Sequence, residues 1–194
     1  NDRPTLLYCP HFDCSLGSFN EFTERLIDAV SADPRYNLIV APHIRLARHW
    51  SAGHRADWIA RGVPDKILID PGSSHSTEMR YTFAADMFIG DVSSQVYECL
   101  VRPRPCLFID AHGADWRDNP DYAMWTLGEV VPPDCDIGAA IERAFATHDR
   151  YRPLQEARVQ RTLDGLHWTP DGQIVFDHDP IARAADRIEG MIRG

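Results

Sequence analysis

Short apolar runs recur along the first two thirds of the chain, and each ends at a proline, a glycine or a polar turn. Apolar runs without polar alternation are typical of buried strands in a parallel sheet. The runs predict strands at Thr5–Cys9, Asn37–Ala41, Lys66–Asp70, Met87–Ile89 and Pro105–Asp110, with a shorter sixth at Glu129–Val131.

Segments with helical spacing separate these runs. Ser18–Glu21 has the pattern of a capping box, and an apolar face then continues from Phe19 to Val30. Further helices are predicted at Thr77–Ala85, Gln95–Val101 and Ile137–Thr147, with loop and helix in His43–Gly62. Strands that alternate with helices in this way predict an α/β fold with a doubly wound parallel sheet.

The last part of the chain has a different pattern. Leu166–Trp168 and Ile174–Phe176 flank a turn and predict two paired strands, and Ile181–Ile192 has the spacing of an amphipathic helix. We therefore expect one main domain over residues 1–150 and a C-terminal extension over residues 151–194.

Charge and composition narrow the class of protein. The formal net charge is −9, so we expect no nucleic-acid partner. No apolar run reaches the length of a membrane span and no signal peptide is recognisable, which predicts a cytoplasmic location. The five cysteines form no Cys-x-x-Cys pair and predict reduced thiols. The histidines lack the spacing of a zinc site, so we expect neither a metal nor a cofactor.

Polar residues directly after the strands are the candidates for ligand binding, because ligands of open α/β sheets lie beyond the carboxyl ends of the strands. Ser93 and Ser94 open a helix there, where backbone N–H groups and the helix dipole favour an anion. Glu98 lies one turn further on, where a carboxylate can accept hydrogen bonds from a ribose diol. A simple helix cap at Asp91 or Ser93 is the structural alternative. The other candidates are His11, Asp13, His43, Arg45, Ser74, His75 and Asp91.

Three segments together resemble a known family. Leu6–Pro10, Leu38–His43 and Met87–Glu98, the last followed by Arg104–Phe108, are similar to the C-terminal half of the CDP-glycerol glycerophosphotransferases. These are GT-B-type enzymes of teichoic acid and capsule synthesis. The resemblance covers roughly residues 5–147 and is most specific in the Asp-x-Ser-Ser segment and in the Pro-His after the second strand.

The resemblance implies a Rossmann-like domain that forms one half of a GT-B fold and holds a nucleotide-activated donor such as CDP-glycerol. By resemblance, Ser93 and Ser94 bind the donor pyrophosphate, His43 contacts the phosphates or the transferred group as the catalytic residue, and Glu98 lies near the ribose. On electrostatic grounds, we expect a protonated histidine to stabilise the negative charge on the departing phosphates. Ala41 stands where the family commonly has a lysine before its Pro-His, which leaves the donor open.

The resemblance also implies a missing partner. The acceptor-binding domain of the family, with its own catalytic histidine, has no counterpart here, and the start at Asn1 suits a cut between the two domains. We therefore expect the isolated chain to be inactive or nearly so, and the full-length protein to associate peripherally with the inner face of the membrane.

Two other readings stay open. An epimerase-like enzyme acting on nucleotide sugars would need an acid and a base within this domain, for which His11, Asp13 and His75 are the candidates. A non-catalytic α/β interaction module is the other. The sequence has no Gly-x-Ser-x-Gly elbow, Walker loop or Gly-x-Gly-x-x-Gly fingerprint, which argues against hydrolases, P-loop kinases and ordinary dehydrogenases.

Overall fold

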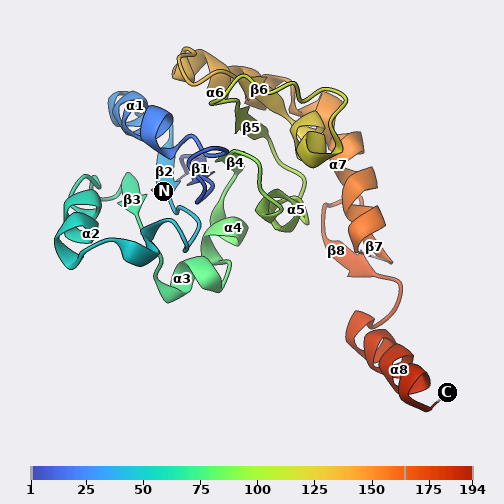
Figure 1. Ribbon diagram of the computed structural model, residues 1–194. Coiled ribbons are helices and arrows are strands. Elements are labelled where there is room, and N and C mark those ends of the chain that lie inside the picture. The colour runs from blue at the N-terminus through green and yellow to red at the C-terminus, as the bar shows by residue number, and fades with distance from the viewer. Residues whose placement is uncertain (1, 164, 194) are drawn as a thin grey trace.

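A six-stranded parallel sheet forms the centre of the protein (Figure 1). The computed structural model describes residues 2–163 and 165–193. The strand order is β3-β2-β1-β4-β5-β6, and every neighbouring pair in it is parallel. The strands are β1 (Thr5–Cys9), β2 (Asn37–Val40), β3 (Ile67–Ile69), β4 (Met87–Gly90), β5 (Cys106–Ile109) and β6 (Glu129–Val131). All six predicted strands and the predicted α/β class are therefore confirmed.

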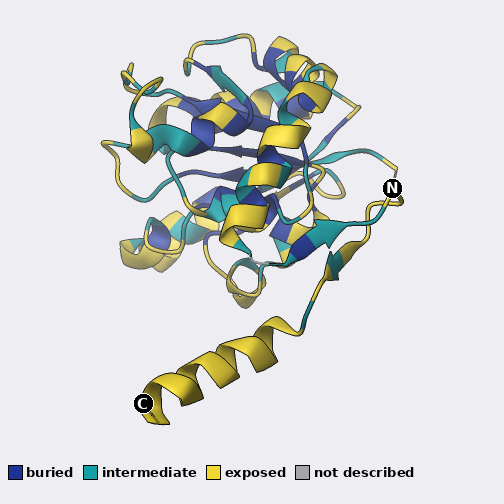
Figure 2. Ribbon diagram, turned by 90° about the vertical axis from the view of Figure 1, so that its right-hand side faces the viewer, coloured by how far each residue is buried: buried dark blue, intermediate teal, exposed yellow. Residues whose placement is uncertain are grey.

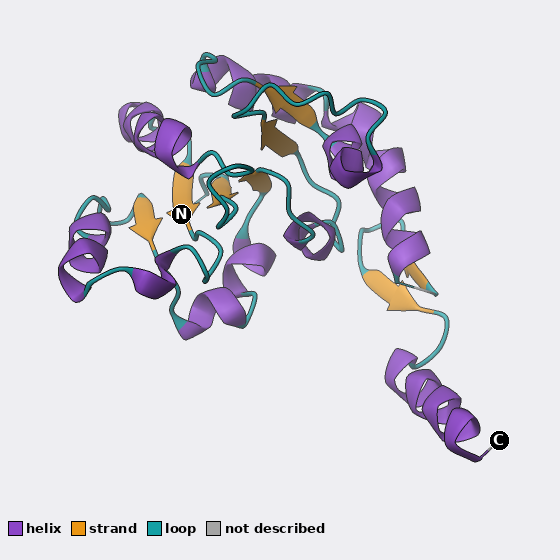
Figure 3. Ribbon diagram, viewed as in Figure 1, coloured by secondary structure: helices purple, strands orange, loops and turns teal. Residues whose placement is uncertain are grey.

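Helices cover both faces of this sheet, because alternate strand residues point to opposite sides (Figure 3). Leu6 and Tyr8 of β1 belong to the core under α1 (Phe19–Ala32) and α6 (Ile137–Ala146). Leu7 and Cys9 belong to the second core, which includes residues of α5 (Gln95–Cys99), η2 (Pro120–Leu127) and α7 (His148–Thr162). Trp58 of α2 (Ala52–Ile59) belongs to the first core. The remaining short helices are η1 (Ala47–His49), α3 (Ser74–Thr77) and α4 (Arg80–Ala84).

The predicted capping box at the start of α1 is wrong. Ser18 is the N-cap residue, but its side chain makes no capping hydrogen bond. Its hydroxyl instead donates to Oδ1 of Asp91 (2.5 Å) and lies 2.8 Å from the hydroxyl of Tyr8. The Ser18 hydroxyl therefore donates to a buried carboxyl in place of accepting from an N–H of the first helical turn, and this hydrogen bond connects α1 to the sheet.

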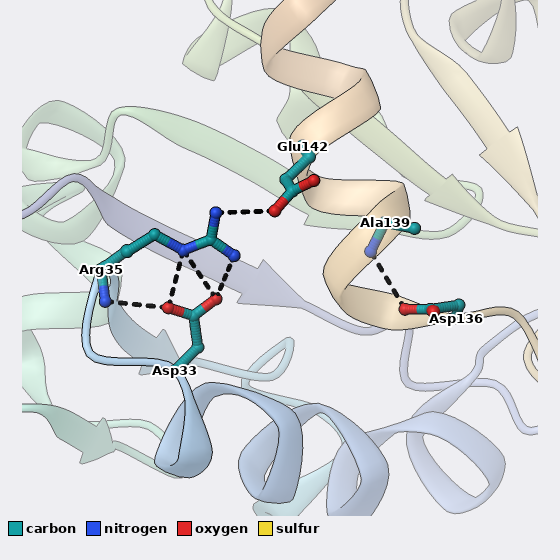
Figure 4. Close-up of polar contacts among 5 residues, drawn as sticks. All are labelled: Asp33, Arg35, Asp136, Ala139 and Glu142. Atoms are coloured by element: carbon teal, nitrogen blue, oxygen red, sulfur yellow. Dashed lines mark hydrogen bonds and ion pairs between the residues drawn. The ribbon is translucent and has the colours of Figure 1, made fainter.

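A surface cluster of charges connects the end of α1 to α6. The guanidinium of Arg35 donates to both carboxylate oxygens of Asp33 and, 2.6 Å away, to Glu142 of α6 (Figure 4). Asp136 caps α6 by accepting from the backbone N–H of Ala139. Arg35 and Glu142 are both about half exposed, so the pair contributes little on its own.

The short helices before β4 differ from the prediction. Instead of one helix over 77–85, α3 and α4 are separated by Met79, whose φ of 60° is left-handed. The two pieces lie at an angle and form one wall of the cleft described below. Likewise, α5 ends at Cys99, two residues before the predicted end.

Helix α7 was not predicted from the sequence, and the predicted domain boundary at residue 150 lies inside it. Its sequence is mostly charged or polar and contains Pro153. It therefore lacks the apolar face by which a helix is recognised, and a proline inside the segment argues against a helix. Gln155 and Val159 are nevertheless buried. Gln155 donates to the carbonyls of Arg104 (2.9 Å) and Leu127 (2.8 Å) and accepts from the N–H of Arg104.

The same network holds a buried arginine. The side chain of Arg104 is almost fully buried and donates to the carbonyls of Thr82 and Ala85, each at 2.6 Å. It therefore fastens the end of α4 to the start of β5. A charge in this position stays solvated by carbonyl dipoles instead of by water.

The two strands and the last helix predicted near the end of the chain are present. β7 (Leu166–Trp168) pairs antiparallel with β8 (Ile174–Phe176), and α8 (Pro180–Arg193) follows. Figure 2 shows α8 exposed along its whole length and extending away from the sheet. Within the described residues, helices are either too short or too polar to cross a bilayer.

We expect Gln155→Ala to lower the free energy of unfolding by about 2–4 kcal/mol, because it leaves two buried carbonyls and one buried N–H without partners. Urea unfolding of the purified variant measures this loss. Gln160→Ala, on the exposed side of the same helix, is the control and is expected to cost less than about 0.5 kcal/mol. Equal losses in the two variants would contradict the docking of α7 through Gln155.

Candidate functional site

A cleft of about 480 Å³ opens beyond the carboxyl ends of β1, β2 and β4. The strand order reverses between β1 and β4, and the gap between the loops at such a point is where open α/β sheets bind ligands. The cleft is lined by Leu7, Cys9, His11, Phe12, Ala41, Pro42, His43, Ile44, Ser76, Thr77, Tyr81, Thr82, Val92, Ser93, Ser94, Gln95 and Glu98.

Five of the predicted site residues line this cleft together: His11, His43, Ser93, Ser94 and Glu98. They come from the loops after three different strands, and the parallel sheet brings those loops to one edge. They were predicted from the sequence only because they follow strands, and ligands of open α/β sheets lie beyond the carboxyl ends of the strands.

The other predicted site residues do not line the cleft, and Asp13 is exposed outside it. The guanidinium of Arg45 lies over the ring of Phe12, 4.1 Å from its centre, so it touches the cleft only through that ring. Ser74 and His75 are exposed on α3, whereas their neighbours Ser76 and Thr77 line the cleft. Asp91 lies beneath the cleft and is fully buried.

The turn from β4 into α5 supplies hydroxyl groups. The backbone N–H of Gln95 donates to the hydroxyl oxygen of Ser93 at 3.2 Å, so the Ser93 proton remains available to a ligand. Ser94 and Glu98 are exposed in the same wall. Because α5 has only five residues, its dipole is weaker than the predicted longer helix would provide, and the hydroxyls carry more of the anion-binding capacity.

The opposite wall is formed by an aromatic group after β1 and β2. The ring centres of His11 and His43 are 6.5 Å apart, and Phe12 lies 4.3 Å from the first and 4.9 Å from the second. Burial lowers the pKa of His43, and the neighbouring His11 and Arg45 lower it further. This differs from the protonated histidine that the sequence analysis expected on electrostatic grounds, because burial and cationic neighbours both disfavour the charged ring.

The third wall depends on two residues, Asp70 and Tyr81, that the sequence analysis did not single out. Asp70, nearly buried at the end of β3, accepts hydrogen bonds from the N–H groups of Gly72 and Ser73 and from the hydroxyls of Ser73, Ser76 and Tyr81. Burial acts to raise the pKa of Asp70, but the hydrogen bonds from Ser73 and Tyr81 outweigh it and keep the pKa below its ordinary value. The ionised carboxylate thus fixes Tyr81 in the cleft.

Asp91 connects the two central loops from below. Its Oδ2 accepts from the backbone N–H groups of His11 (2.8 Å) and Ser18 (3.0 Å), and its Oδ1 accepts from the Ser18 hydroxyl. The indole of Trp125 donates to its carbonyl at 3.2 Å. Burial raises the pKa of Asp91 to about 6, although the hydrogen bonds from Ser18 and His11 oppose this rise.

Across the described ranges, His, Cys, Asp and Glu side chains do not gather in any group of three or more that could hold a metal ion. Both cysteines near the cleft, Cys9 and Cys99, are buried. Burial raises the pKa of each thiol, so neither forms a reactive thiolate at neutral pH.

The chain is similar to known proteins in structure but not in sequence. No protein-family model matches the sequence, and no curated protein matches it by sequence. Among solved structures, a sucrose-phosphate synthase from Thermosynechococcus elongatus is similar over 82% of this chain and 41% of its own, with 20% identity and a TM-score of 0.54. The wall teichoic acid polymerase TagF is similar over 81% of this chain and 38% of its own, with 14% identity and a TM-score of 0.53.

The chain therefore spans about two fifths of the length of the solved proteins that it matches. A variant of TagF soaked with CDPG has 16% identity and a TM-score of 0.51. The protein has a Rossmann-like α/β fold that matches part of the GT-B glycosyltransferases.

We expect Asp91→Asn to change the pH dependence of stability. The native pKa of about 6 lies above the ordinary value of 3.8, so the unfolded chain releases its proton first as the pH rises. The parent should therefore lose up to about 3 kcal/mol of stability relative to the variant between about pH 4 and pH 6. Urea unfolding at several pH values measures the difference.

Asp28→Asn, on the exposed face of α1, is the control, and its stability should stay parallel to that of the parent. A constant difference between the parent and Asp91→Asn over this pH range would mean that Asp91 is ionised in the native protein throughout.

Proposed function

We propose that this chain is the donor-binding domain of a GT-B transferase and holds a nucleotide-diphospho donor in the cleft between β1 and β4. The proposal depends chiefly on one observation: His11 and His43 on one wall and Ser93, Ser94 and Glu98 on the other line a single cleft at the point where the strand order reverses. Its volume of about 480 Å³ is in the range of small-molecule sites.

The hydrogen-bonding groups of the cleft suit both the diphosphate and the ribose of a nucleotide-diphospho compound. Serine hydroxyls and imidazole N–H groups donate hydrogen bonds to the oxygens of a diphosphate. The carboxylate of Glu98 accepts hydrogen bonds from the hydroxyls of a ribose. A ligand with an anionic end and a diol at the other therefore uses both walls.

The proposed reaction is the transfer of glycerophosphate or a glycosyl group from this donor during the synthesis of a cell-envelope polymer. Such a transfer leaves negative charge on the departing phosphate. Fixed donors in the cleft stabilise that charge as it develops, because they need no reorganisation at the moment of transfer. In this scheme His43 contacts the phosphates or the transferred group, and Ser93 and Ser94 hold the pyrophosphate.

CDP-glycerol, or a related nucleotide-diphospho compound, is the proposed donor. Two arguments support it: the similarity of the Met87–Glu98 segment to the glycerophosphotransferase family, and the similar fold of a teichoic acid polymerase soaked with CDPG. The acceptor would be bound by a second domain, and the full-length protein would work at the inner face of the membrane. Of the three candidates for the acid and base of an epimerase-like enzyme, only His11 lines the cleft, whereas Asp13 and His75 are exposed and do not line it.

We expect CDP-glycerol to bind saturably to the purified chain in calorimetric titrations, more tightly than UDP or GDP. Ser94→Ala and Glu98→Ala should each weaken this binding by about ten-fold, because each removes a hydrogen bond to the ligand. Ser74→Ala, on exposed α3, is the matched serine control and should bind as the parent does.

Equal affinity in Ser94→Ala and Ser74→Ala would contradict the assignment of the site. Turnover of a nucleotide sugar by the isolated chain would favour the epimerase-like enzyme. Absence of binding to any of the three nucleotides would favour the interaction module.

A further inference from the structure

Each of the two histidines of the cleft accepts a hydrogen bond on its ring from a nearby backbone N–H. The backbone N–H of Asp13 donates to Nδ1 of His11 at 3.1 Å, and the backbone N–H of Arg45 donates to Nδ1 of His43 at 3.2 Å. In each case the donor is two residues further along the chain. Both rings line the cleft, one after β1 and the other after the neighbouring strand β2.

This hydrogen bond to Nδ1 determines which ring nitrogen carries the proton. A neutral imidazole has one N–H and one acceptor nitrogen, and the hydrogen bond made by one nitrogen sets the state of the other. Because Nδ1 accepts in both rings, the neutral proton is on Nε2 in both. A second proton would have to go onto Nδ1, where it would face the backbone N–H and break the hydrogen bond.

The surroundings of the rings have mixed charge. Arg45 and His11 act against a positive charge on His43, and the ring of Phe12 lies against both imidazoles. Acidic groups also face the pair: Asp91 accepts from the backbone N–H of His11, and Glu98 lines the same cleft. The carboxylate of Asp13 accepts from the N–H and the hydroxyl of Ser15 (2.9 and 2.7 Å).

We propose that His11 and His43 bind the diphosphate of the donor as a pair of uncharged Nε2–H donors, and act neither as cations nor as general bases. This inference rests on the proposed function, since it specifies how that donor is held. Donation from a neutral Nε2–H needs no added proton, so the affinity of the site should not fall as the pH rises through the histidine titration range. A general base would need a free Nε2 lone pair, which this tautomer does not have.

The first test needs no ligand. Long-range ¹H–¹⁵N correlation spectra of the ¹⁵N-labelled chain distinguish the two neutral tautomers and the charged ring of each histidine. We expect the Nε2–H form for both residues at about pH 7.5. An Nδ1–H form or a charged ring at this pH, for either residue, would overturn the proposal.

The second test measures binding against pH. CDP-glycerol is the probe, because its diphosphate is a diester and lacks the phosphate group that titrates near about pH 6 in CDP. The parent should bind it with less than about two-fold change between about pH 6.5 and 8.5. A loss of affinity of about ten-fold per pH unit in this range would show that the rings bind as cations and would overturn the proposal.

Two substitutions at each ring separate donor position from donor charge. The amide nitrogen of glutamine can occupy the place of Nε2, whereas the shorter asparagine reaches only the place of Nδ1. His43→Gln and His11→Gln should therefore keep affinity within about three-fold, and His43→Asn and His11→Asn should lose about ten-fold or more. His49→Gln, exposed and outside the cleft, is the control.

The outcomes distinguish the donor role of the histidines from the proposed function. Binding that falls equally in the glutamine and asparagine variants, in proteins that unfold at the parent's urea midpoint, overturns the donor role and leaves the proposed function standing. Absence of binding by the parent, with His49→Gln behaving alike, overturns the proposed function and the phosphate-binding role of the rings together.

Discussion

The buried carboxyl of Asp91 is the contact on which the geometry of the cleft depends. It lies directly after β4 and accepts backbone N–H groups from both ends of the loop that joins β1 to α1. That loop carries His11 and Phe12 into the cleft. A carboxyl is suited to this task because its two oxygens can hold three donors at once in a dry environment, where each unsatisfied donor would be costly. The loop is thereby fixed relative to Ser93 and Ser94.

The sheet could be predicted from the sequence because its strands are short, apolar and closed by turn residues. When segments with helical spacing separate such runs, few folds other than a parallel α/β sheet fit the pattern. Helix α7 could not be predicted in this way: Gln155 is buried through hydrogen bonds to the main chain of distant segments, and a glutamine in the sequence carries no sign of such partners. Ser18 shows the same limit, because its local pattern predicted a cap while a residue 73 positions away accepts its hydroxyl.

The candidate site was predictable where it follows strand ends and unpredictable where it depends on side-chain direction. His11, His43 and Ser93 come directly after strands, so the topology alone brings them to one edge. Arg45 and Asp91 also follow strands, yet the first turns onto Phe12 and the second turns inward. Tyr81 enters the cleft only because α3 and α4 are bent at Met79 and held by Asp70, which no spacing rule indicates.

Helix α3 is attached to the rest of the protein less firmly than the other parts of the cleft. The other two walls rest on loops that are fixed by the central strands, and Arg104 fastens α4 to β5. Helix α3 is held by hydrogen bonds from Ser73 and Ser76 to Asp70, at the end of an edge strand. Residues such as Ser76 and Thr77 have little share in either core. Changes in this segment can therefore accumulate without loss of the fold, so divergence between related proteins in the ligand that they accept should concentrate here.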